Sequence, residues 1–101
     1  MNIDELKKRA KAGDIDSQAY LGYAYQSGQG IRKNSAAAVT WYQEAAYAGQ
    51  PHAQLGMGYA LEYGEGIKRD TQLSMNWYRK AHRSGNAQAC YYIARCYESG
   101  T

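Results

Sequence analysis

The chain has 101 residues, with 12 Lys and Arg against 9 Asp and Glu, and this net charge of +3 is too small to indicate a nucleic-acid-binding protein. No apolar run approaches the ~18 residues that a membrane span needs, and the N-terminus lacks the apolar stretch of a signal peptide. We therefore expect a cytoplasmic protein with no membrane insertion. Phe is absent, so the large apolar side chains are mainly those of 11 Tyr and 2 Trp.

The first twelve residues predict one short helix. The spacing Asn2-x-x-Glu5 resembles a capping box, in which two side chains satisfy the free amide groups at a helix start. Leu6 and Ala10 then fall on the register of Tyr42 and Ala46 in a later predicted helix. Residues 1–12 are therefore expected to be the second half of a helix pair.

Residues 13–48 predict two helices joined by a loop. The first should span about 15–27, and Asp14 before it is a good capping residue because its carboxylate can accept from the first free amides. Gly28 should end this helix, since glycine adopts the left-handed conformation without steric penalty. After a short loop, Asn34 is expected to cap the second helix.

Residues 49–84 repeat this arrangement at a period of 36 residues. Pro51 falls in the first turn of a helix, where its missing amide hydrogen is not needed. Glycines inside the predicted helices each cost up to ~1 kcal/mol relative to Ala, so we expect neighbouring helices to approach closely there. The repeated structural positions are Gly22, Gly28, Gly30, Trp41 and Tyr42 in the first unit, and Gly58, Gly64, Gly66, Trp77 and Tyr78 in the second.

Residues 85–101 begin a third unit with one more helix, which Asn86 should cap. In the second helix of the first unit, one apolar stripe recurs at i, i+3, i+4, i+7 and i+8, formed by Ala38, Trp41, Tyr42, Ala45 and Ala46. A fixed period of this length is typical of stacked helical units. We therefore predict an all-α solenoid of about six helices in a single domain, 1–101. Its divisions are 1–12, 13–48, 49–84 and 85–101.

This spacing of glycine, Trp-Tyr and alanine resembles the Sel-one-like repeat, a relative of the tetratricopeptide repeat. The resemblance covers about residues 5–100, with departures at Leu61, Ser74 and His82. It implies a right-handed solenoid with the first helix of each unit on the concave side. Members of the family work largely as adaptors and scaffolds, so the resemblance implies a protein partner and neither catalysis nor a cofactor.

The concave side of the predicted solenoid is the candidate partner-binding surface. Residues opposite the core stripe recur at i, i+4, i+7 and i+11, so they line one side of each first helix. Because aromatic residues and Arg are enriched at binding hot spots, we expect a Tyr-lined groove for a peptide or helix of a partner. Alternatively, the tyrosines only cover a thin core. The candidates are Asp16, Tyr20, Tyr23, His52, Tyr59, Tyr63, Tyr92 and Arg95.

Other motifs predict no further site. The two Gly-x-Gly pairs do not continue into a phosphate-binding loop, and His52 and His82 have no ligand cluster around them that would predict a metal site. Cys90 and Cys96 are six residues apart in one helix, about 9 Å of rise, which disfavours a disulfide between them. We expect two buried or half-buried thiols, with no histidine placed by a motif to activate either.

The two ends of the chain suggest an alternative function. The first predicted helix lacks a preceding partner and the last lacks a following one, so chains could stack end to end as a homo-oligomer. The residues expected at such contacts are Ile3, Leu6, Tyr91 and Tyr97. An enzyme is not expected, because the sequence shows no cluster of titratable residues suited to catalysis.

Overall fold

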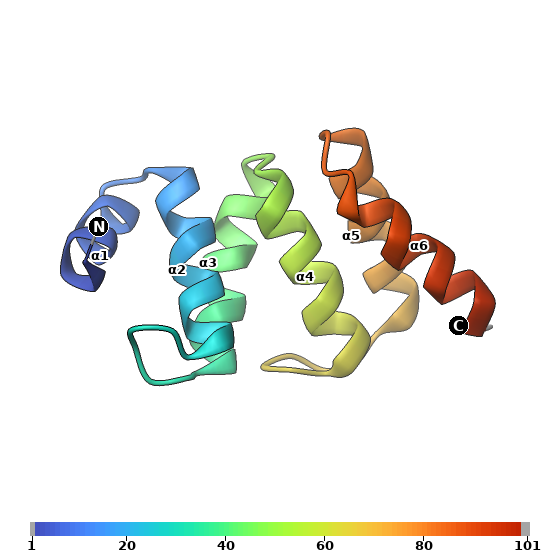
Figure 1. The fold of residues 1–101 in the computed structure, drawn as a ribbon, viewed down its shortest axis with the longest axis horizontal. Helices are drawn as coiled ribbons and strands as arrows, with labels where there is room; N and C mark the ends of the chain where they lie inside the picture. Colours follow the sequence, from blue (N-terminus) through green and yellow to red (C-terminus); the bar gives the residue numbers. More distant parts are fainter. Residues whose placement is uncertain (1, 100–101) are drawn as a thin grey trace.

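The computed structural model describes residues 2–99, so residues 1, 100 and 101 of the outermost predicted units lie outside the described range. The described part is all α-helical and forms an elongated row of 41 × 25 × 17 Å (Figure 1). Each helix packs against the next one along the chain, and α2 also contacts α4. The helices are α1 (Ile3–Lys11), α2 (Ile15–Ser27), α3 (Ser35–Tyr47), α4 (Pro51–Tyr63), α5 (Thr71–Arg83) and α6 (Gln88–Ser99). The predicted all-α fold of about six helices is confirmed.

Side chains and glycines fix most helix ends where the sequence predicts them. Asn2, Asn34 and Asp70 each accept a hydrogen bond from the backbone amide three residues later, at 2.8, 3.1 and 3.0 Å. Gly28 and Gly64 end α2 and α4 with φ of 79° and 67°, in the left-handed region that favours glycine. These local signals explain why helix boundaries could be read from the sequence.

The start of α2 differs from the prediction. Asp14 occupies the capping position, but its side chain makes no capping hydrogen bond to the backbone. Instead its Oδ2 accepts from the hydroxyl of Ser17 at 2.7 Å. Ser17 is buried, and a buried hydroxyl needs a partner, so it competes with the backbone amides for this carboxylate. The hydrogen bond from Ser17 also lowers the pKa of Asp14.

Glycines inside α2 and α4 make room for tyrosine rings of the neighbouring helices. A Cβ on Gly22 would lie 2.7 Å from Cδ1 of Tyr42, and one on Gly58 would lie 2.5 Å from Cδ1 of Tyr78. Gly56 borders the same Tyr42 ring from α4, since a Cβ there would lie 2.6 Å from Cζ. The close approach predicted from the repeated helical glycines is therefore confirmed, and Tyr42 is held between two helices.

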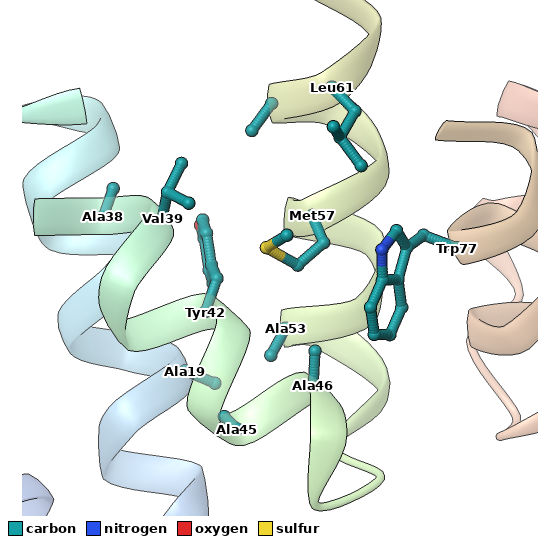
Figure 2. Close-up of a cluster of buried hydrophobic side chains, with 11 residues drawn as sticks. Ala19, Ala38, Val39, Tyr42, Ala45, Ala46, Ala53, Met57, Leu61 and Trp77 are labelled. Atoms are coloured by element: carbon teal, nitrogen blue, oxygen red, sulfur yellow. The ribbon is translucent and has the colours of Figure 1, made fainter. Parts of the chain in front are cut away.

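The main hydrophobic cluster extends from α2 and α3 through α4 to α5. Figure 2 shows Met57 of α4 between Tyr42 of α3 and Trp77 of α5. Alanines from α3 and α4 surround these larger side chains, so the helix backbones approach while the rings and the thioether fill the space. None of the helices within residues 2–99 is long and apolar enough to span a membrane.

Candidate functional site

The helices that begin each unit, α2, α4 and α6, line a groove of about 870 Å³. Tyr20 and Tyr23 enter the groove from α2, Tyr59 from α4 and Tyr92 from α6. Tyr20 is 69% exposed and Tyr23 is 50% exposed, so much of their ring surface faces solvent. The structure thus brings candidate tyrosines from three consecutive units together on one surface.

A missing side chain shapes the centre of this groove. Tyr20, Gly56 and Tyr92 occupy equivalent positions 36 residues apart, and Gly56 alone has no ring there. The ring of Tyr42 occupies the space beside Gly56 that a side chain there would need, and it borders the groove although it is almost fully buried. Burial raises the pKa of Tyr42, so the phenol remains neutral, and its hydroxyl donates to Oε1 of Gln26 at 2.7 Å. Gly56 follows the same helical spacing as the candidate residues of α4, and the structure places it in the groove lining.

Polar groups lie at the two ends of the groove. Near the helix starts, Asp16 accepts a hydrogen bond from Nε2 of Gln50 at 3.3 Å, and His52 lies exposed on the lining. Near the loops that follow the helices, the lining includes Lys33 and Glu65. Both signs of charge are present, so the groove favours neither a strongly acidic nor a strongly basic ligand.

Tyr63 and Arg95 lie beside the groove rather than in its lining. Arg95 forms an ion pair with Glu62, and its guanidinium carbon lies 5.5 Å from the ring centroid of Tyr63 and 5.0 Å from that of Tyr92. Glu62 also accepts a hydrogen bond from the hydroxyl of Tyr78 at 2.6 Å. Arg95 is therefore already engaged within the protein, a contact that its place among the predicted partner-binding residues did not indicate.

One of the two thiols differs from the sequence prediction of buried or half-buried cysteines. Cys96 is buried, but Cys90 is exposed, and no disulfide joins them. Sγ of Cys90 lies 3.2 Å from Nδ1 of His82, a contact that the sequence did not predict. The antiparallel packing of α5 on α6 brings these residues together across a turn, and no sequence motif encodes that contact. Over residues 2–99, no group of three or more His, Cys, Asp or Glu side chains is placed to hold a metal ion.

Comparison with protein families identifies the repeat. The model of the Sel1 repeat matches residues 15–50, 51–86 and 87–101. The first two matched stretches each contain 36 residues, the period seen in the sequence, and begin two residues after the predicted units. Sel1 repeats typically mediate protein interactions, and the match indicates no catalytic family. No curated protein matches the chain.

Solved structures share this fold. A Sel1 repeat protein from Oxalobacter formigenes is 36% identical, with a TM-score of 0.86 over 92% of this chain and 70% of that one. The protective antigen c5321 of uropathogenic Escherichia coli, which displays an SLR fold, is 35% identical, with a TM-score of 0.87 over 94% of this chain and 20% of that one.

A third structure supports the fold alone. Helicobacter pylori cysteine rich protein B is 24% identical, with a TM-score of 0.78 over 86% of this chain and 65% of that one. The chain therefore spans only part of each of these relatives, down to one fifth of the antigen. Because the family model matches three successive stretches that together cover residues 15–101, the chain belongs to the Sel1 repeat family.

Proposed function

We propose that this repeat protein is an adaptor that binds a peptide segment of a partner protein in the groove lined by α2, α4 and α6. The observation that carries the proposal is the set of groove tyrosines contributed by three consecutive units. Exposed tyrosine rings offer a large contact area with little conformational entropy to lose, and such residues dominate binding energy at interfaces. The groove volume of about 870 Å³ lies within the range of formed binding pockets.

The chemistry of the groove indicates the kind of segment that fits. Its centre is apolar and aromatic around Gly56 and Tyr42, whereas its ends carry polar and charged side chains such as Asp16 and Lys33. A segment with large apolar side chains in the middle and polar residues on both sides would bury its apolar atoms against the tyrosines. The polar ends would then fix its register and direction.

Replacing both Tyr23 and Tyr59 with Ala is expected to weaken partner binding at least about tenfold, because each removes a ring from the groove lining. The partner would first be identified by affinity capture and mass spectrometry, and its binding segment mapped to a synthetic peptide. Titration calorimetry with that peptide would then give the dissociation constants of the wild type and the variant.

Tyr47→Ala is the matched control. Tyr47 is 71% exposed on α3 and does not line the groove, so its loss should leave the affinity unchanged. Far-ultraviolet circular dichroism would establish that each variant is folded. Full affinity in a folded Tyr23→Ala/Tyr59→Ala protein would exclude the groove as the binding site.

A second candidate function, self-assembly, is favoured by two exposed tyrosines of α6. Tyr91 and Tyr97 are 65% and 64% exposed. If the chain self-assembles, sedimentation equilibrium will show a mass that rises with concentration. Tyr97→Ala should then suppress this rise, whereas Tyr23→Ala/Tyr59→Ala should not. A monomeric mass at the highest concentration would argue against self-assembly. So would the finding that Tyr97 is covered by a further helix in a longer chain.

A further inference from the structure

The contact between α5 and α6 departs from the contact that the earlier units share. Nε2 of Gln54 donates to the carbonyl oxygen of Ala46 at 3.3 Å, and Gln18 makes the same contact one unit earlier. One period later, the two positions hold Cys90 and His82. There the interaction runs between side chains, with Sγ of Cys90 3.2 Å from Nδ1 of His82. Both partners of this single contact differ from those of the earlier units.

The pair has the composition of an activated nucleophile. A neutral imidazole nitrogen can accept the proton of a thiol, and the resulting thiolate is the reactive form of cysteine. Cys90 lies in the first turn of α6, where the helix dipole favours a negative charge. Both side chains are exposed, so a small reagent can reach the sulfur, whereas Cys96 is buried. Neither residue of the pair lines the groove.

We propose that Cys90 is a modification site that forms a mixed disulfide with a low-molecular-weight disulfide, with His82 as the proton acceptor. The thiol proton passes to Nδ1 of His82, and the sulfur of Cys90 attacks one sulfur of the small disulfide. The bond between the two reagent sulfurs breaks as the new bond to Cys90 forms. The departing thiolate then takes the proton from His82.

The exchange is balanced without a further oxidant. The sulfur of Cys90 is oxidised, the departing sulfur is reduced, and an excess of free thiol reverses the reaction. This is a stoichiometric modification outside the groove, and it does not depend on the proposed adaptor function.

The reaction rate of the native protein with 4,4′-dithiodipyridine tests the proposal. This reagent is a neutral disulfide whose leaving group absorbs light, and peptide mass mapping assigns the modified cysteine. Cys90 is expected to react at least about tenfold faster in the wild type than in His82→Ala, because the variant lacks the proton acceptor. Alanine is a natural residue at this repeat position, as Ala46 shows.

Controls separate the role of the imidazole from general effects. His52→Ala removes the only other histidine and should leave the rate unchanged. Cys90→Ser should abolish the fast reaction, and Cys96→Ser should retain it. In denaturant, wild type and His82→Ala should react equally, because the contact depends on the fold.

The same measurements give the results that would overturn the proposal. Equal native rates for Cys90 in the wild type and in His82→Ala would do so, as would labelling confined to Cys96. Because Cys96 is buried, its slow labelling in each variant shows that the fold is intact. If His82→Ala labels Cys96 rapidly, His82→Gln becomes the variant for the comparison, and the same tenfold criterion applies to it.

Discussion

Gly66→Ala is expected to lower the free energy of unfolding by about 3 kcal/mol or more, whereas Gly30→Ala should lower it by only about 1 kcal/mol. The two glycines occupy equivalent loop positions, with nearly equal φ of 74° and 73°, so both variants place a side chain in the left-handed region. The difference comes from the surroundings. A Cβ on Gly66 would overlap the carbonyl oxygen of Ser35, whereas one on Gly30 would have no atom within 4 Å.

Urea unfolding followed by circular dichroism would give both free energies under the same conditions. Because the carbonyl of Ser35 belongs to the backbone at the start of α3, it cannot move aside as a flexible side chain could. An equal loss for the two variants would contradict the close packing of the loop after α4 against α3.

Tyr42→Ala should lower the free energy of unfolding by about 4 kcal/mol, close to the cost of removing other large buried rings. The Tyr42 side chain is only 3% exposed, and its ring lies between Gly22 and Gly56. Glycines have no side chains that could move into the space left by the ring, so the cavity would persist. The substitution also removes the hydrogen bond that the Tyr42 hydroxyl donates to Gln26.

Tyr42→Phe distinguishes the contribution of the ring to the free energy of unfolding from that of the hydroxyl. It keeps the packing and removes the hydrogen bond, so we expect a loss of about 1 kcal/mol. Tyr20→Ala, at a position that is 69% exposed, should leave stability nearly unchanged. The measurement is the same urea titration, and similar losses for the Phe and Ala variants would show that the ring contributes little.

The sequence predicted the fold well because its signals are local. Asn34 and Asp70 cap helices through amides three residues away, and Gly28 and Gly64 end helices through their own backbone conformation. Because the pattern recurs every 36 residues, the helices predicted for one unit can be assigned to the other units. Such features can be recognised in the sequence without the tertiary structure.

The site was only partly predictable, since its details depend on contacts between units. Helical spacing placed Tyr20, Tyr23 and Tyr59 on one surface, but the partner of Arg95 is Glu62 of the preceding unit, 33 residues away. The contact between His82 and Cys90 likewise depends on how two helices pack across a turn. Side-chain partners of this kind follow from the packing of the units and not from a motif.

The groove crosses helices of three units that otherwise pack mainly against their immediate neighbours in the chain. In such an array, stability is a sum of terms within units and between adjacent ones, so distant units are only weakly coupled. A segment bound along the groove would touch α2, α4 and α6 at once and link units that have little direct contact. Occupancy would therefore make unfolding more cooperative, because the segment would be released only when the whole array opens.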